Sequence, residues 1–365
     1  MRFWLLLSVA AFWCHSASAQ QADWEKEWNR IVAHAQKEGR VVVAGPANPT
    51  ARVEIPAKFK ERFGISVEWI SGGTRGLVER LRLEHKAGLS TFDVFLGGSS
   101  TVATVLYPEK MIDPIRPLLL LPDVVDGSKW KPGKLWFTDP EERYILRVFS
   151  TVREILHINT NLVKREDLKT VEDLKRHMLN PAWKGKISIA PPGDAGTGSN
   201  TAAQFLARLG DDFAKKFFVD HKPVVLRDAR QAADSLARGV HPISLGARQE
   251  DIARMQAEGL PVATIYGLSG WTGTVASGSG HVVLIRNAPN PNAARVFINW
   301  LASKEGLELY ARSNQSAPTR NDIDESFLPP EVIPNPNMTY VDGASWEFTT
   351  KERDEVKAYF NEIMK

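Results

Sequence analysis

The sequence has little cysteine and little net charge. Cys14 is the only cysteine among 365 residues, so an internal disulfide and a cysteine-ligated metal site are both excluded. Lysine and arginine (46) exceed aspartate and glutamate (43) by only three, which gives no large positive excess for binding nucleic acid or an anionic membrane. The remaining composition, 43% hydrophobic and 24% charged, is that of a globular chain long enough for two domains.

The motifs that mark the best-known catalytic sites are also missing. The sequence contains no HExxH, no GxxxxGK[ST], no GxSxG and no complete GxGxxG. Zinc proteases, phosphate-loop enzymes, serine hydrolases of the elbow type and dinucleotide-binding enzymes therefore lack their signatures here. No two histidines have the spacing of metal ligands on one helix turn or hairpin. These absences favour a protein that is not an enzyme and that carries no cofactor or metal.

The N-terminus has the three parts of a secretory signal. Arg2 precedes an apolar run over residues 3–13, and Ala17-Ser18-Ala19 follows as a small-residue cleavage site. We expect residues 1–19 to be a signal peptide, cleaved after Ala19, and the mature protein to lie in the periplasm without any cysteine. The alternative is that Cys14 carries a lipid, but the bulky Phe12 and Trp13 before it suit that processing poorly. No later apolar run is long enough for a membrane helix.

The first part of the mature chain alternates helices and strands. Apolar runs predict strands at 41–44, 65–69 and 92–96, with amphipathic helices between them. Each strand ends in a small polar loop, at 45–50, 72–75 and 97–101. This alternation predicts a mostly parallel sheet flanked by helices. In such sheets ligands bind beyond the carboxyl ends of the strands, where helix N-termini present free N–H groups.

The same alternation continues further along the chain and predicts a second lobe over residues 155–262. We assign the first lobe to residues 20–150 together with 268–330, because extended segments and an amphipathic helix follow the second lobe. Residues 331–365 form a C-terminal tail with a helix over 351–364, whose docking site the sequence does not indicate. No internal repeat is recognisable in the sequence.

The strand-end loops hold the best candidates for ligand binding. Thr74-Arg75, Ser99-Ser100 and Thr197-Gly198-Ser199 combine hydroxyls with free backbone donors at the start of helices, which suits a carboxylate, phosphonate or phosphate group. The alternative is that these hydroxyls only cap their helices. Trp271 lies in a glycine-rich loop, and it either stacks on a ligand or fills a gap in the core.

Several blocks of sequence resemble one known family. They are His157–Val163, Lys169–Leu174, Trp183–Ile187, Ala288–Ala294, Phe297–Leu301 and Ser303–Gly306. In this order they are similar to the extracellular solute-binding proteins of ABC importers, and most closely to the ferric-iron-type subgroup of the type II periplasmic binding proteins. The resemblance implies two α/β lobes joined by a hinge, which close on one solute and deliver it to an ABC permease in the inner membrane, without a covalent step.

The iron binders of this family hold the metal with two adjacent tyrosines. Gln249 and Glu250 stand at the matching positions here, and Arg248 precedes them. Without the two phenolates, and with an arginine that grips a planar anion, the sequence favours a small anionic or zwitterionic organic ligand over bare ferric ion. The predicted ligand-binding residues, with Trp271 placed near the hinge, are Thr74, Arg75, Ser99, Ser100, Thr197, Gly198, Ser199, Arg248 and Trp271.

Three other functions stay open at this point. The first is binding of iron through a synergistic anion and carboxylates, and the second is an exported enzyme on the same scaffold, since a fold does not fix a function. The third is a sensor domain that feeds a receptor. For all of them we expect a monomer that binds a small molecule and no nucleic acid.

Overall fold

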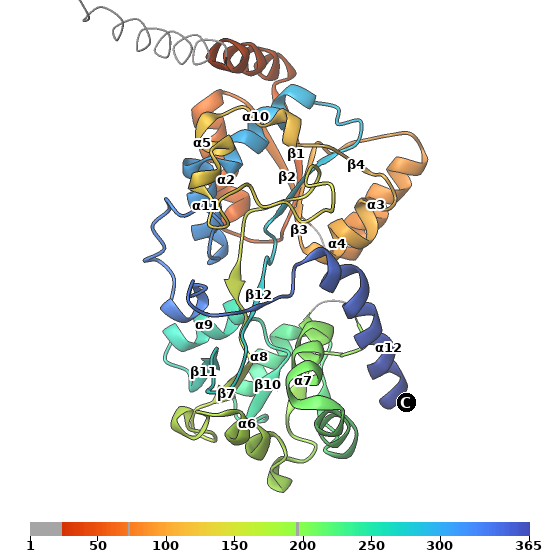
Figure 1. Ribbon diagram of the computed structural model, residues 1–365, viewed down its shortest axis with the longest axis vertical. Helices are drawn as coiled ribbons and strands as arrows, with labels where there is room; N and C mark the ends of the chain where they lie inside the picture. Colours follow the sequence, from red (N-terminus) through yellow and green to blue (C-terminus); the bar gives the residue numbers. More distant parts are fainter. Residues whose placement is uncertain (1–23, 72–73, 195–196) are drawn as a thin grey trace, which may run out of the picture. The chain divides into compact units, whose positions relative to one another are not determined.

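The structure is a computed structural model that describes residues 24–71, 74–194 and 197–365. The expected signal peptide lies outside the described residues. The chain divides into two compact units: unit 1 combines Met1–Phe149 with Gly278–Phe327, and unit 2 combines Ser150–Ser277 with Leu328–Lys365 (Figure 1). Among the described residues, no helix has the length and apolar character needed to cross a membrane.

Unit 1 is built on a mixed sheet of six strands. β1 runs parallel to β2 and β3, whereas β13 is antiparallel to β3, β4 and β5. Five strands therefore share one direction and β13 runs against them, in the order β2-β1-β3-β13-β4 with β5 also on β13. The strands are β1 (Arg40–Gly45), β2 (Ser66–Ser71), β3 (Val94–Gly97), β4 (Ile112–Asp113), β5 (Leu146–Arg147) and β13 (His281–Ile285).

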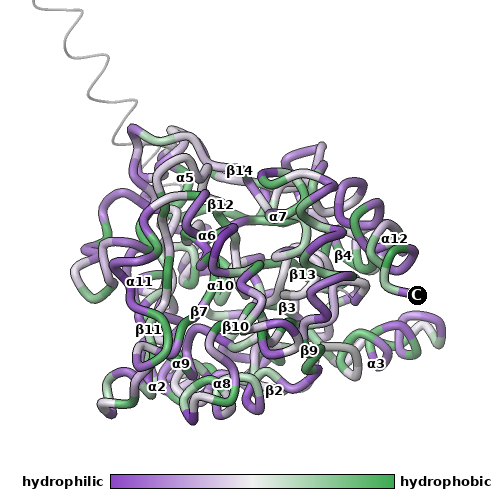
Figure 2. The backbone as a smooth tube through the Cα atoms, turned by 90° about the horizontal axis from the view of Figure 1, so that it is seen from below, coloured by the Kyte–Doolittle hydropathy of each residue, from purple (hydrophilic) through white to green (hydrophobic). Residues whose placement is uncertain are grey.

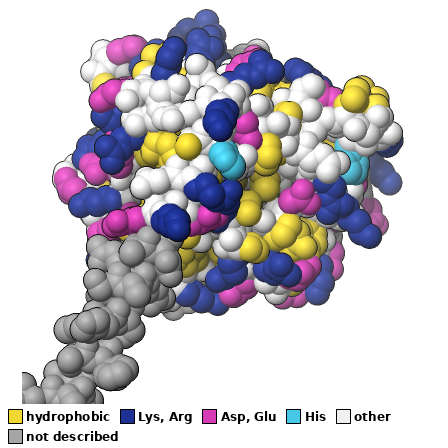
Figure 3. Space-filling model, turned by 90° about the horizontal axis from the view of Figure 1, so that it is seen from above, with side chains coloured by type: hydrophobic (Ala, Val, Ile, Leu, Met, Phe, Trp, Pro, Cys, Tyr) yellow, Lys and Arg dark blue, Asp and Glu magenta, His cyan; other side chains and the backbone are white. Residues whose placement is uncertain are grey.

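Helices pack on this sheet and build the core of unit 1. Phe59 lies 5.3 Å, between ring centroids, from both Phe297 and Trp300, so the helices that carry these rings share one apolar core. Charged side chains of both signs are interspersed on the face shown in Figure 3. The helices are one over 24–38, α2 (Ala51–Phe63), α3 (Thr74–Lys86), α4 (Ser99–Thr101), α5 (Pro122–Val125), α10 (Pro291–Ala302) and α11 (Lys304–Asn314).

A buried carboxylate joins the start of α10 to the sheet. Asp93 is fully buried and accepts hydrogen bonds from Val42 N (2.7 Å), Asn290 N (2.7 Å) and Asn290 Nδ2 (2.9 Å). Two of these donors are backbone groups, and the bond from Val42 N is buried. The Ala288–Ala294 block of the sequence therefore has a structural role here, because Asn290 fixes the entry into α10.

Unit 2 contains a second mixed sheet, of five strands. β8 is parallel to β9 and β10, and β7 is antiparallel to β10 and β11. The order is β11-β7-β10-β8-β9. The strands are β7 (Leu156–Asn159), β8 (Ser188–Ile189), β9 (Val224–Val225), β10 (Ile243–Leu245) and β11 (Val262–Ile265), and the helices are α6 (Val171–Met178), α7 (Thr197–Ala214), α8 (Ala229–Ala237) and α9 (Gln249–Ala257).

The two sheets have the same topology. Numbered by their parallel strands along the chain, each has the order second, first, third, reversed strand, fourth. The reversed strand is β13 in unit 1 and β7 in unit 2, and the chain reaches each of them directly after crossing from the other unit. Because this repeat lies in backbone topology and not in residue identity, it is not visible in the sequence.

The boundaries of the lobes differ from the expectation at three places. Ser150 and residues 328–330, expected in the first lobe, belong to unit 2. Residues 268–277, also expected in the first lobe, belong to unit 2 as well. They contain β12 (Thr274–Ala276), which pairs with β6 (Thr151–Val152) and β14 (Val341–Asp342) in a small separate sheet. These backbone hydrogen bonds hold the segment on unit 2.

The C-terminal tail also packs on unit 2. It carries a π-helical turn over Phe348–Glu352 and the amphipathic helix α12 (Arg353–Ile363) (Figure 2). Phe360 of α12 is 1% exposed, and its ring meets Phe218 edge-on at 4.6 Å between centroids. Burial of one face of α12 therefore fixes the helix whose docking site the sequence left open.

Candidate functional site

The predicted hydroxyl-bearing loops of unit 1 follow the carboxyl ends of β2 and β3. Ser99 is buried and comes two residues after β3, and the backbone carbonyl of Ser100 accepts a hydrogen bond from Thr104 Oγ1 (2.7 Å). Thr74 and Arg75 begin α3 directly after β2, but their side chains lie outside the described residues. Ser71 Oγ donates to Pro46 O (3.2 Å), so the loops after β1 and β2 lie side by side.

A buried histidine lies at the same edge of this sheet. His281, the first residue of β13, pairs with Gly97 at the end of β3 and with Arg147 of β5. Its Nε2 lies 3.0 Å from Thr138 Oγ1. Complete burial, together with the nearby Arg147 charge, lowers the pKa of His281 to about 3, so the imidazole is neutral at physiological pH. No local sequence pattern places His281 at this edge, because the antiparallel direction of β13 brings it here.

In unit 2 the loops after β8 and β10 pack backbone against backbone. A Cβ atom on Gly198 would lie 2.0 Å from Pro191 O, and one on Gly246 would lie 2.7 Å from Ala190 N. Neither contact can be relieved by a side-chain rotation, so both positions require glycine. Ser199, next to Gly198, is fully buried, whereas the side chain of Thr197 lies outside the described residues.

Arg248 is an accessible cation at this edge of unit 2. Its side chain is 60% exposed and its Nε lies 3.2 Å from Asp251 Oδ2. Hydrogen bonds from the backbone N–H groups of Gln231 and Arg230 lower the pKa of Asp228 at the start of α8, and Arg248 contributes to the same shift. The guanidinium therefore lies near the N-termini of α8 and α9. Because it is exposed, it can bind an anion from solvent.

Trp271 occupies a different environment from the loops. It is 6% exposed, its ring meets Phe205 edge-on at 5.5 Å, and the guanidinium of Arg208 lies over it at 5.1 Å. These contacts are those of a core residue. The packing therefore supports the role of Trp271 in filling a gap in the core. Trp271 is not part of the ligand site proposed below.

The reversed strand β7 brings further polar residues to the edge of unit 2. Ile155 N donates to Ile265 O (2.8 Å), which places Arg153 and Glu154 beside Tyr266 at the end of β11. Arg153 pairs with Glu154 at 2.8 Å. Among the described residues, the buried hydroxyl of Tyr266 has no hydrogen-bond partner. Burial, followed by Glu154 and other carboxylates, raises the pKa of this phenol. No local sequence signal marks these residues, because the strand direction decides their position.

Gln249, one of the two residues at the positions of the tyrosine pair, is committed to an internal chain of hydrogen bonds. Thr264 Oγ1 donates to Gln249 Oε1 (2.8 Å), and His157 Nδ1 lies 3.0 Å from the same hydroxyl. Burial lowers the pKa of His157, which keeps its ring neutral.

Within the described part of the chain, no three His, Cys, Asp or Glu side chains form a group that could hold a metal ion. The hardest donors at this edge of unit 2 are the carboxylates of Glu154 and Glu250 and the buried phenol of Tyr266. The accessible charges there include the Arg248 guanidinium, a group that can bind a planar anion.

Comparison with known proteins identifies the family. Residues 54–339 match the family of bacterial extracellular solute-binding proteins. The chain belongs to this family. Its members bind small ligands and deliver them to membrane permeases of ABC importers, and the type II periplasmic binding protein fold expected from the sequence is confirmed.

Three similar proteins illustrate the range of the family. The iron uptake protein A1 of Synechocystis is 24% identical over 73% of this chain and 71% of that protein. The periplasmic binding protein AfuA of Actinobacillus pleuropneumoniae, solved with fructose-6-phosphate, has a TM-score of 0.67 at 19% identity and covers 89% of this chain and 98% of its own. Iron-bound HitA of Pseudomonas aeruginosa has a TM-score of 0.63 at 16% identity, with 89% and 99% covered.

Proposed function

We propose that this solute-binding subunit of an ABC importer captures a small anionic or zwitterionic organic solute in the periplasm. The observation that carries the proposal is Arg248: an accessible guanidinium beside the glycine loops of β8 and β10, where the iron-binding relatives of the resemblance carry their tyrosine pair. A planar guanidinium binds carboxylate and phosphate oxygens through two parallel hydrogen bonds. AfuA, which has the same fold, was solved with a phosphorylated sugar.

The loops of unit 1 complete the proposed site. Ser99, Ser100 and the start of α3 at Thr74-Arg75 follow the carboxyl ends of their strands, as Gly198 and Ser199 do in unit 2. Hydroxyls and free backbone N–H groups orient an anion at such positions. The two units close on the solute by bending at a hinge, and small-angle scattering should show a smaller radius of gyration in the presence of ligand.

The decisive experiment compares two arginines of the same region. A thermal-shift screen of carboxylates, phosphonates, amino acids, sugar phosphates and ferric ion identifies the ligand, because a ligand at 100 times its Kd adds about 2.7 kcal/mol to stability. Calorimetry then measures its Kd with Arg248→Ala and with Arg254→Ala, the matched control on the same helix, whose side chain is 50% exposed. We expect Arg248→Ala, and likewise Arg75→Ala, to cost about 2 to 5 kcal/mol of binding. Equal affinity in the wild type, Arg248→Ala and Arg75→Ala would refute the anion assignment.

Binding of iron is the second candidate, and it has its own support. Tyr266, Glu154 and Glu250 offer oxygen donors at the edge of unit 2, and the relative from Synechocystis is an iron uptake protein. Ferric ion would have to displace the phenol proton, which the raised pKa of Tyr266 opposes. Metal analysis of the purified protein and a visible phenolate-to-iron band that disappears in Tyr266→Phe would favour iron over the organic anion.

A further inference from the structure

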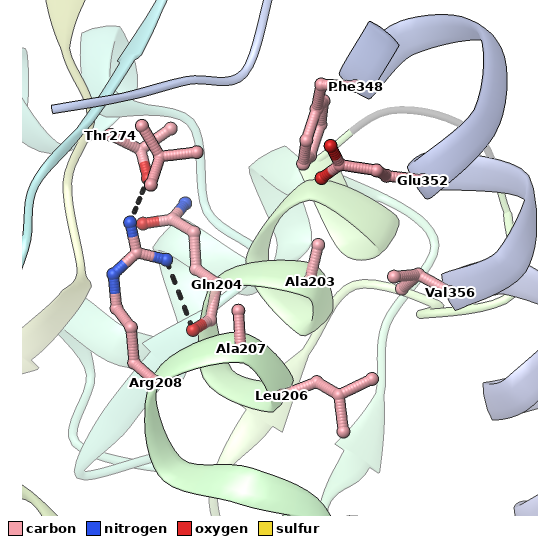
Figure 4. Close-up of a pocket in the computed structure, with 10 residues that line it drawn as sticks. Ala203, Gln204, Leu206, Ala207, Arg208, Thr274, Phe348, Glu352 and Val356 are labelled. Carbon is pink, nitrogen blue, oxygen red and sulfur yellow. Dashed lines mark hydrogen bonds between the residues drawn. The ribbon is translucent and has the colours of Figure 1, made fainter.

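Unit 2 contains a cavity apart from the strand-end loops. It has a volume of about 150 Å³ and lies between α7, β12, β14 and the C-terminal tail (Figure 4). All of its lining residues belong to unit 2. Ala207 and Glu352, which line the cavity, are exposed, so the cavity opens to solvent and a small molecule can enter it.

Most of the cavity wall is apolar. Ala203, Leu206 and Ala207 of α7 form one side, and Phe348 and Val356 of the tail face them. An apolar cavity of about 150 Å³ in another protein accepts a benzene molecule. The wall therefore fits a compact hydrocarbon body the size of one ring.

One end of the cavity carries a positive charge that no carboxylate neutralises. Arg208 donates hydrogen bonds to Thr274 Oγ1 (2.8 Å) and to the backbone carbonyls of Thr272, Gly273 and Gln204. Among the described residues, no carboxylate lies within ion-pair distance of it, and burial alone lowers its pKa. The guanidinium is partly buried and, among the described residues, meets only neutral acceptors and the Trp271 ring, so an anion at this end of the cavity would pair with its charge.

Gln204 lies beside this charge. It is 4% exposed, its Oε1 is buried with no hydrogen-bond partner among the described residues, and its carboxamide lies next to the Arg208 guanidinium. An amide N–H and a guanidinium N–H together can hold one carboxylate. On the opposite side, the carboxylate of Glu352 points toward the cavity and would repel a second negative charge.

We propose that this cavity binds a small monocarboxylate with a compact apolar body, such as a benzoate-sized acid. The carboxylate binds at Arg208 and Gln204, and the apolar body packs between α7 and Phe348 of the tail. The ligand thereby neutralises the Arg208 charge and joins the tail to α7. This second site belongs to unit 2 alone and does not depend on the solute proposed above.

Calorimetry on the full mature chain with three molecules of one shape tests the charge requirement. We expect benzoate to bind, benzamide to bind at least tenfold more weakly, and benzylamine not to bind, because only benzoate supplies the missing anion. Equal binding of benzoate and benzylamine, or no binding of benzoate at millimolar concentration, would overturn the proposal.

Variants locate the site. Ala207→Leu fills the cavity from its exposed rim and should weaken benzoate at least tenfold, whereas Ala253→Leu, at an exposed position of α9, should leave the affinity unchanged. Glu352→Gln removes the repelling charge and should tighten benzoate about two- to fivefold, and Glu355→Gln, in the adjoining helix α12 but outside the cavity, should not. Arg248→Ala should leave benzoate binding intact. Benzoate binding that is lost in Arg248→Ala but kept in Ala207→Leu would assign it to the strand-end loops instead.

Discussion

The buried His281 should make the stability of unit 1 depend on pH. Its imidazole is completely buried at the end of β3, with Nε2 3.0 Å from Thr138 Oγ1, and its pKa falls from 6.5 to about 3 on folding. Because the unfolded chain binds a proton to this residue below pH 6.5 and the folded chain does not, protonation favours the unfolded state between pH 6.5 and about 3. The contribution of His281 to stability is complete above pH 6.5 and is lost as the pH falls.

The size of the effect follows from the same two pKa values. Each pH unit below 6.5 costs about 1.4 kcal/mol, so lowering the pH from 6.5 to 5.0 should remove about 2 kcal/mol of the free energy of unfolding. A typical protein has only about 5 to 15 kcal/mol in total. The loss is therefore large enough to measure.

The assay is urea denaturation at pH 7, 6 and 5, followed by tryptophan fluorescence and circular dichroism, for the wild type and for His281→Gln. Burial also lowers the pKa values of His157 and His221, but both histidines are present in the two proteins, so their effect cancels in the difference. We expect the two stability curves to converge as the pH falls. Parallel curves over this range would show that His281 takes up its proton in the folded state and would refute the reasoning.

Three further predictions concern packing. Gly246→Ala should destabilise unit 2 by about 2 kcal/mol in thermal melts, because the new Cβ would lie 2.7 Å from Ala190 N. Gly267→Ala should be neutral in the same assay, because its Cβ would have no atom within 4 Å. Asp93→Ala should cost about 3 kcal/mol in urea denaturation, since the buried N–H of Val42 and the partly buried N–H of Asn290 lose their acceptor, and Asp93→Asn should cost less. Phe360→Ala should cost about 3 to 5 kcal/mol and make the tail accessible to limited proteolysis before the rest of the chain; an intact tail in that assay would contradict the packing described for α12.

The local elements could be predicted from the sequence because their signals are local. The apolar spacing through Ile55 and Phe59, with Gly64 after it, predicts the helix that the structure shows as α2, and Gly64 ends it with a φ of 72°. The wholly apolar Val41–Val43 predicts a buried strand. In the structure it lies in β1, which has a neighbouring strand on each side. Periodicity and capping residues act within a few positions, so the chain alone reveals them.

The parts that could not be predicted depend on the direction of distant strands. His281 and Arg153 lie at the edges where the predicted loops end only because β13 and β7 run against their neighbours. A run of apolar residues has the same pattern in either direction, so no spacing rule identifies these residues. The position of Trp271 in the core was likewise not predictable, because Phe205 and Arg208, which contact it, are more than 60 positions away in the sequence.

The late position of β13 has a consequence for how the chain reaches its native state during synthesis. β3 has an unpaired edge, and β4 has no partner strand among the described residues, until residue 285 is available. A nascent chain that begins to fold from its N-terminus must therefore carry an incomplete sheet while residues 150–277 of unit 2 are made. Exposed strand edges promote aggregation, so a holdase chaperone that covers this intermediate would protect the first half of the polypeptide until translation nears its end.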